Sequence, residues 1–186
     1  MAVSAGGCDF GWRGIDAILP GVDGNEHQIS ALIGPGGLVV AFICNHCPYV
    51  KGQIARMVRD ARDLAVQGVG FVAINSNDAS THPDDSFDNM KLFAREYKLP
   101  FPYLYDEDQS LARAYKAVCT PDFFGFNADM ALQYRGRLDA SRRADAPDDL
   151  RRDLYEAMLE EARTGRGPQD QVPSIGCSIK WKHEAW

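Results

Sequence analysis

The sequence has little that would suit it to bind a nucleic acid or a membrane surface. Its 20 Lys and Arg residues are outnumbered by 26 Asp and Glu residues, which gives a formal net charge of −6. A negative charge disfavours contact with phosphate groups and anionic lipids. No apolar run approaches the roughly 18 residues of a transmembrane helix, and residues 1–14 lack the basic start and apolar stretch of a secretory signal. We therefore expect a cytoplasmic protein with neither a nucleic-acid nor a membrane partner.

Internal repeats and low-complexity segments are also missing, which favours one domain over residues 1–186. We place its core at about residues 15–163 and a C-terminal tail at residues 164–186. A chain of this length buries about 70% of the surface that its unfolded form exposes, so its core needs no disulfide framework. The five cysteines therefore require a chemical explanation more than a structural one.

Two short apolar runs, residues 37–43 and 69–74, have the composition of buried strands. Between them, apolar side chains recur with the spacing of one helix face over residues 54–65. A strand, a helix and a second strand in this order predict a parallel pair with a right-handed crossover.

The alternation of helices and strands continues to the end of the core. The further segments that we predict are a hairpin at residues 15–30, helices at 85–97, 110–115 and 147–163, and strands at 101–105, 122–127 and 131–135. The last two strands are joined too tightly to be parallel. The predicted fold class is therefore α/β, with a mixed central sheet flanked by helices and an N-terminal β-hairpin extension. The tail from Thr164 has the composition of a polar linker.

The segment with the most chemistry is Cys44-Asn45-His46-Cys47, where the first buried strand passes into the first helix. Two cysteines three positions apart on an opening helical turn can close a disulfide ring with little backbone movement. Unpaired N–H groups at a helix start favour a thiolate, and a protonated His46 would favour it further. Cys44, at the exposed start of the turn, is expected to attack a disulfide, and the more buried Cys47 to complete the exchange.

Three other interpretations of this pair are weaker. Zinc needs about four ligands, usually from a second closely spaced pair, whereas Cys8, Cys119 and Cys177 stand alone. Covalent haem attachment requires a histidine directly after the second cysteine, where the sequence has Pro48. Two cysteines acting only as small core hydrophobes would not be separated by two polar residues. We therefore expect no metal and no cofactor.

A second informative site is Thr120-Pro121, directly before the strand at residues 122–127. Proline cannot donate to a β-ladder, so at the start of a strand it marks an edge, a bulge or a cis peptide bond. An ordinary trans turn is the alternative that base frequency favours. The neighbouring Cys119 is either a third redox thiol or a small buried hydrophobe.

In the order of these elements the sequence resembles the thioredoxin fold. Four separated segments resemble, more narrowly, the peroxiredoxin-like redoxins of the alkyl hydroperoxide reductase and thiol-specific antioxidant superfamily. These segments are residues 42–51, which contain CNHCPYVK, and residues 73–78, 119–124 and 176–182.

The resemblance implies a cis-Pro121 loop beside the dithiol and catalytic roles for Cys44, Cys47, His46, Thr120 and Pro121. The sequence nevertheless departs from true peroxiredoxins. Counted back from the second cysteine of the pair, the first cysteine occupies the position of their motif threonine, and a valine occupies that of their motif proline.

The interpretation that follows is a thiol–disulfide oxidoreductase acting through the Cys44–Cys47 dithiol, with a protein or small-molecule disulfide as substrate and a thiol reductant as partner. Two alternatives remain: a thiol-dependent peroxidase in which peroxide oxidises Cys47, and a redox sensor or binding module without turnover. Cys177 is expected to anchor the tail or to pair with another thiol, the former being favoured. Cys8 is expected to have no role.

Two further groups of residues are interpreted as structural. The stretch from His82 to Asp85 is expected to be a loop with a helix cap. Arg135, Arg137 and Asp139 are expected to be solvated, although a similar Arg-Gly-Arg segment in the family leaves a substrate contact open.

Overall fold

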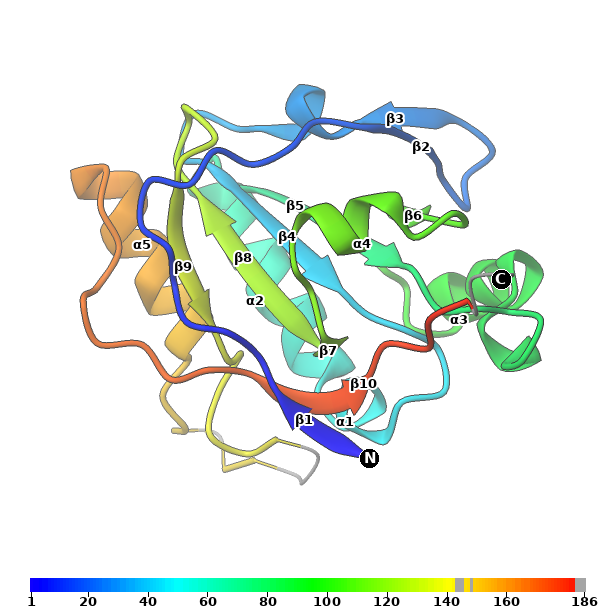
Figure 1. Cartoon of the computed structure of the whole chain (residues 1–186). Helices are drawn as coiled ribbons and strands as arrows, with labels where there is room; N and C mark the ends of the chain where they lie inside the picture. Colours follow the sequence, from blue (N-terminus) through cyan, green and yellow to red (C-terminus); the bar gives the residue numbers. More distant parts are fainter. Residues whose placement is uncertain (143–145, 148, 183–186) are drawn as a thin grey trace.

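The computed structural model describes residues 1–142, 146–147 and 149–182. Its centre is a five-stranded sheet with the strand order β6-β5-β4-β8-β9 (Figure 1). The three parallel strands β4, β5 and β6 are joined by β8 and β9, each antiparallel to its neighbours. This arrangement confirms the predicted mixed sheet. The strand bounds are β4 (Leu38–Phe42), β5 (Gly70–Asn75), β6 (Tyr103–Tyr105), β8 (Asp122–Phe126) and β9 (Leu132–Gly136).

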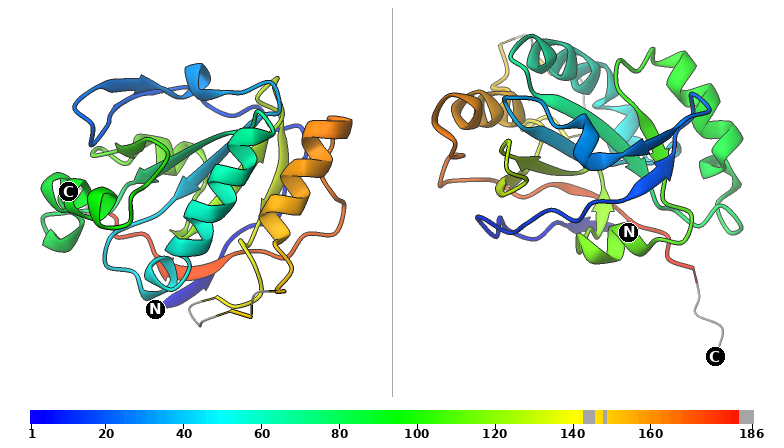
Figure 2. Two further views of the ribbon diagram at one scale, coloured as in Figure 1. Left: turned by 180° about the vertical axis from the view of Figure 1, so that it is seen from behind. Right: turned by 90° about the horizontal axis from the view of Figure 1, so that it is seen from above.

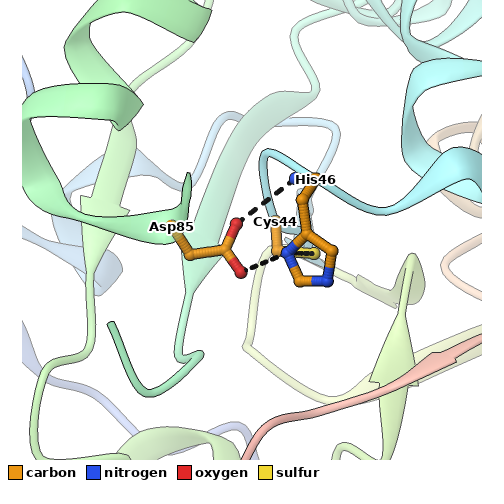
Figure 3. Close-up of side chains that lie close together, drawn as sticks. All are labelled: Cys44, His46 and Asp85. Carbon is orange, nitrogen blue, oxygen red and sulfur yellow. Dashed lines mark hydrogen bonds and ion pairs between the residues drawn. The ribbon is translucent and has the colours of Figure 1, made fainter. Parts of the chain in front are cut away.

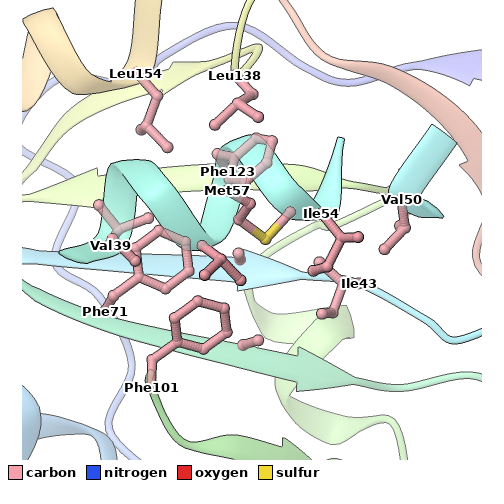
Figure 4. Close-up of a cluster of buried hydrophobic side chains, with 14 of the residues drawn as sticks. Val39, Ile43, Val50, Ile54, Met57, Phe71, Phe101, Phe123, Leu138 and Leu154 are labelled. Carbon is pink, nitrogen blue, oxygen red and sulfur yellow. The ribbon is translucent and has the colours of Figure 1, made fainter. Parts of the chain in front are cut away.

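The central strand β4 divides the core between the two faces of the sheet, because successive side chains on a strand point to opposite sides. Val39 and Ala41 belong to a cluster that includes side chains of α2 (Ile54–Val66), α3 (Phe87–Glu96) and α5 (Asp153–Thr164). Figure 4 shows part of this cluster. The other three β4 side chains belong to a second cluster, with side chains of α4 (Ser110–Ala114). In Figure 2, α2 and α5 lie side by side across one face of the sheet.

The predicted N-terminal hairpin is confirmed. It consists of β2 (Ile18–Pro20) and β3 (Glu26–Gln28), which pair antiparallel. The turn contains Gly24, whose φ of 87° suits glycine, and a short 3₁₀ turn, η1 (Ile29–Leu32), follows the hairpin. An isolated bridge joins Gly21 to β6, so the hairpin covers the exposed edge of the central sheet.

The last core helix begins later than predicted, at residue 153 instead of 147, and residue 148 of the predicted helix lies outside the described residues. The residue before the helix, Arg152, explains the difference. Its side chain forms ion pairs of 2.7 Å with both Asp60 and Asp63 of α2. Arg152 is therefore the N-cap of α5 and not an interior helical residue.

The composition of the tail predicted a polar linker, but part of the tail forms a strand. Residues 175–178 form β10 (Ile175–Ser178), the middle strand of a second sheet between β1 (Ala2–Ser4) and β7 (Cys119–Thr120). Ile179 after it is buried, as the anchoring of the tail requires. The composition did not reveal this strand, because a short edge sheet needs few apolar residues. The final residues of the tail, 183–186, lie outside the described residues.

One position in β10 shows how closely this strand approaches β7. A side chain at Gly176 would overlap the backbone carbonyl of Thr120. Glycine therefore allows β10 to pack against the strand that leads into Pro121.

We expect Gly176→Ala to lower the free energy of unfolding by about 1–3 kcal/mol, because the added methyl group must displace backbone. Gly7→Ala is the matched control, since a side chain at Gly7 meets nothing within 4 Å, and its effect should stay within about 0.5 kcal/mol. Urea unfolding of both variants measures the difference. Equal effects of the two substitutions would contradict the close approach of β10 and β7.

Candidate active site

The two motif cysteines lie on the loop between β4 and the short helix α1 (Pro48–Lys51). Cys47 is the N-cap residue of α1, and Pro48 takes the first helical position as expected. Cys44 precedes the helix. Both side chains are 0% exposed, so the expectation that Cys44 stands at an exposed turn was wrong. Of the residues around it, described below, His46 is local, whereas Thr120 comes from a distant part of the chain and gives no local signal in the sequence.

The thiols of Cys44 and Cys47 lie close to each other, and each shifts the pKa of the other. Both are free thiols. Two cysteines that are three positions apart in the sequence and have neighbouring thiols can be joined by a disulfide without a large movement of the backbone. The pair that the spacing predicted is therefore brought together in three dimensions.

Thr120 and Pro121 lie directly against this pair, and the peptide bond between them is cis. The trans alternative is therefore wrong for this structure. Thr120 contacts both sulfurs: its Oγ1 is 3.3 Å from Cys44 Sγ, and its carbonyl oxygen accepts a hydrogen bond of 3.1 Å from Cys47 Sγ. Thr120 thus holds the two sulfurs from one side.

Asp85 is a site residue that the sequence did not reveal. It ends the 3₁₀ turn η2 (Pro83–Asp85), which replaces the predicted loop, and its side chain is fully buried. Its carboxylate accepts hydrogen bonds from the backbone N–H groups of Asn45, at 2.7 Å, and His46, at 3.3 Å. It also lies 2.6 Å from His46 Nδ1. The helix cap is Ser86, which accepts from the backbone of α3.

Side chains from the end of β5 and from β6 form further hydrogen bonds with Asp85 and with its partner Asn45. Asn77 Nδ2 donates to Asp85 over 2.7 Å, and Asn75 Nδ2 donates to the Asp85 carbonyl over 2.9 Å. The hydroxyl of Tyr103 donates to Asn45 Oδ1 over 2.9 Å. Residues 73–78, noted above only for their resemblance, thus position the residue that holds the Cys44–Cys47 loop.

His46 separates Cys44 from solvent. Its Nδ1 lies 4.0 Å from Cys44 Sγ and faces Asp85, as Figure 3 shows. The imidazole stacks on His82 with a centroid distance of 5.4 Å, and 25% of the side chain is exposed. It lines an open pocket of about 330 Å³ together with polar side chains that include Lys51 and Glu96. A ligand in this pocket would meet His46 before it reached either sulfur.

The surroundings favour a thiolate on Cys47 and a protonated Cys44. Hydrogen bonds lower the pKa of Cys47, the largest contribution coming from the Cys44 thiol and others from Cys177 and the Val50 N–H, against the effect of burial. The pKa of Cys44 is raised by its hydrogen bond to Cys47, by burial and by the charge of Asp85. The Thr120 carbonyl stabilises the protonated form of Cys47, but it is one acceptor against several donors. In the reduced pair, the negative charge therefore lies on Cys47.

The other cysteines differ in how they lie relative to this pair. Cys119 is buried, and its thiol donates to the Pro121 carbonyl over 3.6 Å, while burial strongly raises its pKa. Its role as a third thiol stays a prediction. Cys177 contacts Cys47, which no local sequence pattern indicated. Cys8 is half-buried, and its neighbours are Gln171 and Arg135.

Two of the charged residues after β8, Arg135 and Asp139, are buried, contrary to expectation, whereas Arg137 is partly exposed. Arg135 is 8% exposed and pairs with the fully buried Asp122 at 3.0 Å. Asp139, also buried, pairs with Arg56 at 2.7 Å. Arg137 forms an ion pair of 2.6 Å with the first residue of α5. These pairs join β8, β9 and their flanking helices, so they support the sheet.

Three possible metal ligands also gather here. Cys44, His46 and Asp85 each offer an atom, and these atoms all lie within 4.8 Å of one another. The Asp85 carboxylate, however, already accepts from several N–H groups, and His46 Nδ1 is directed at it. The geometry fits a hydrogen-bonded carboxylate that orients a histidine.

Comparisons with known proteins bear on the family and the fold of the chain. Residues 11–135 match the AhpC/TSA family. A search of curated proteins found no match. Over the part of the chain that the structure describes, no helix has both the length and the apolar character needed to cross a membrane.

Three solved structures illustrate the similarity. An uncharacterized conserved protein of Geobacillus kaustophilus is 45% identical, covering 100% of this chain and 98% of its own with a TM-score of 0.92. A hypothetical protein of Sinorhizobium meliloti is 36% identical, covering 97% of this chain and 99% of its own with a TM-score of 0.89. A secreted disulfide oxidoreductase of Mycobacterium tuberculosis is 20% identical, covering 77% and 95% with a TM-score of 0.58. This last likeness shows that the fold is thioredoxin-like.

We expect Asp85→Asn to lower the pKa of Cys44, because the substitution removes a negative charge that raises it. It should also lower the free energy of unfolding by about 1–3 kcal/mol, since an amide cannot accept every hydrogen bond that the carboxylate accepts. The rate of alkylation of Cys44 by iodoacetamide as a function of pH, measured in a Cys47→Ser background, reports this pKa.

Asp84→Asn is the matched control, because the Asp84 side chain is exposed. It should leave the alkylation profile of Cys44 unchanged. If Asp85→Asn and Asp84→Asn gave the same profile, Asp85 would not act on Cys44 through its charge.

Proposed function

The chain belongs to the AhpC/TSA family, and we propose that it acts as a thiol–disulfide oxidoreductase whose redox pair is Cys44 and Cys47. The observation that carries the proposal is the close approach of these two thiols, which both contact Thr120. The cis Thr120-Pro121 bond beside them supports it. The substrate would be a protein or small-molecule disulfide, and a thiol compound would be the reductant. A compartment that supplies such thiols, for example the cytoplasm, suits this cycle.

The first step joins the substrate to Cys44, which lies beneath His46 next to the open pocket. The reduced pair shares one proton, which can pass from Cys44 to Cys47 along their hydrogen bond. The Cys44 thiolate then attacks one sulfur of the substrate disulfide. A mixed disulfide forms, the substrate disulfide breaks, and the departing thiolate takes a proton from solvent or from a protonated His46.

The second step completes the reduction within the protein. Cys47 loses its proton and attacks Cys44 Sγ, so that the Cys44–Cys47 disulfide forms and the second substrate thiolate leaves. Two electrons have passed from the dithiol to the substrate. Thr120 contacts both sulfurs throughout, and Asp85 positions His46.

Peroxide reduction is a second candidate, which the stabilised negative charge on Cys47 favours. The Cys47 thiolate would attack the O–O bond, giving a sulfenic acid on Cys47 and releasing water or an alcohol. The Cys44 thiol would then condense with the sulfenic acid, forming the same disulfide and releasing water. Cys44 occupies the position of the peroxiredoxin threonine, so it would supply a reducing thiol where that family has a hydroxyl.

For disulfide reduction, we expect Cys44→Ser and Cys47→Ser each to lower the rate by more than about 100-fold, because each step uses one of these sulfurs. Cys119→Ser should keep at least half of the rate, since the Cys119 thiol is bonded to Pro121. Reduction of insulin disulfides measures the effect. Equal losses for all three variants would contradict the assignment of the pair.

The peroxidase candidate predicts a different pattern in a peroxide-consumption assay with a thiol reductant. Cys47→Ser should abolish consumption, whereas Cys44→Ser should reduce it only in part. If neither assay exceeded the rate of the Cys44→Ser/Cys47→Ser double variant, both enzymatic assignments would be wrong, and a sensor without turnover would remain.

A further inference from the structure

We propose that Cys177 is a third redox thiol, which accepts the disulfide from the buried pair as a Cys47–Cys177 bond and presents it to external thiols. This inference rests on the proposed function of the Cys44–Cys47 pair. It assigns the route by which electrons reach that pair.

The pairing of β10 with β7 places Cys177 on the correct side of the small sheet. Cys177 lies directly opposite Thr120 in this antiparallel pair, and directly opposite residues point their side chains to the same face. The Thr120 side chain contacts Cys44. The Cys177 side chain accordingly packs against the cluster that contains both motif cysteines, and Cys47 is among the groups that shift its pKa.

Cys119, on the strand that pairs with β10, can be compared with Cys177 for the direction of its side chain. It lies opposite Ser178 in the same pair of strands, so its side chain points to the other face of the small sheet. Its thiol is bonded to the Pro121 carbonyl. Two cysteines on neighbouring strands thus differ in orientation, and the one that faces Cys47 is Cys177.

Exposure makes Cys177 easier for an external thiol to reach than the other two sulfurs. Cys44 and Cys47 are both 0% exposed, whereas Cys177 is partly exposed. An external thiolate must approach the sulfur that it attacks. A disulfide on Cys177 is open to attack without displacement of His46 or Thr120.

The segment that carries Cys177 is held on both sides. Ser178 N donates to the Met1 carbonyl over 3.2 Å, and Ile179 N donates to the Val118 carbonyl over 3.1 Å. Lys180 N donates to Asn77 Oδ1 over 2.9 Å, and Asn77 also donates to Asp85. One asparagine therefore joins the Cys177 segment to the carboxylate that holds the Cys44–Cys47 loop.

The charge on Cys47 makes Cys177 respond to the state of the pair. Burial, the hydrogen bond to Cys47 and the charge of Cys47 raise the pKa of Cys177 to about 11, while Lys180 and the N-terminal amine oppose this rise. When Cys47 is part of a disulfide, its charge is gone. That charge then no longer raises the pKa of Cys177, although burial still does, so a Cys177 thiolate is less disfavoured when there is a disulfide to attack.

The exchange moves a disulfide without net oxidation. The Cys177 thiolate attacks Cys47 Sγ, the Cys47–Cys177 bond forms, and the Cys44–Cys47 bond breaks. Cys44 leaves as a thiolate and takes up a proton in place of the one that Cys177 lost. A thiol reductant then attacks Cys177 Sγ and releases Cys47. A second reductant thiol attacks the sulfur of the first, which leaves Cys177 reduced and the reductant as a disulfide.

The direct test is to map disulfides in Cys44→Ser after oxidation with diamide, a thiol oxidant. Trypsin places Cys47, Cys119 and Cys177 on separate peptides, residues 14–51, 117–135 and 167–180. We expect a cross-link between peptides 14–51 and 167–180 in monomeric protein, and the same cross-link in Cys44→Ala and in Cys44→Ser/Cys119→Ser. A cross-link from peptide 14–51 to peptide 117–135, or none in a folded variant, would overturn the inference.

The kinetic test uses Cys177→Ser and Cys177→Ala, with folding checked by thermal unfolding. Both variants should still form the Cys44–Cys47 disulfide, but glutathione should reduce it at least about tenfold more slowly than in the wild type. Unchanged reduction rates would overturn the role of Cys177 alone. Failure of the wild type to form a Cys44–Cys47 disulfide would instead overturn the proposed function, so the two failures are distinct.

Discussion

The burial of two neighbouring thiols, Cys44 and Cys47, sets the requirement that the surrounding residues meet. A buried thiolate is costly unless several donors compensate for the water that it has lost. These donors surround Cys47: hydrogen bonding by Cys44, Cys177 and the Val50 N–H lowers its pKa and so favours its thiolate. The pKa of Cys44 is raised by Cys47, by burial and by the charge of Asp85, so its protonated form is favoured. The pair is thus polarised by residues outside its own loop.

The fold brings these residues together from four places in the chain. The Cys44–Cys47 loop follows the central strand β4, and Asp85 arrives from the turn before α3. Thr120 precedes β8, the antiparallel neighbour of β4. Cys177 is brought in by β10, which pairs with β7. Because three of these four segments follow or precede strands of one sheet, the rigidity of that sheet determines the geometry of the sulfurs.

The sequence predicted the parts of this site that have a local pattern. The apolar runs identified β4 and β5, and the spacing of Cys44 and Cys47 identified the thiol pair. The position of Pro121 before a strand left an edge, a bulge or a cis bond open, and the family resemblance implied the cis bond that the structure has. Asp85 was missed because nothing local distinguishes it from Asp84, and only the 3₁₀ turn buries one carboxylate and exposes the other. Pairing of Cys177 with another thiol was only the less favoured alternative, because β10 is a short strand and the register that turns this thiol towards Cys47 is entirely non-local.

The most direct test of the central claim is a titration of the wild-type protein in glutathione redox buffers, with alkylation, intact mass and peptide mapping at each potential. The account predicts one transition in which the protein loses the mass of two hydrogen atoms, with the new disulfide mapped inside the tryptic peptide of residues 14–51. The account also predicts a second population of oxidised protein, in which the disulfide joins Cys47 to Cys177. A protein that kept all five thiols free across the whole range, or that formed its first disulfide without Cys47, would contradict it.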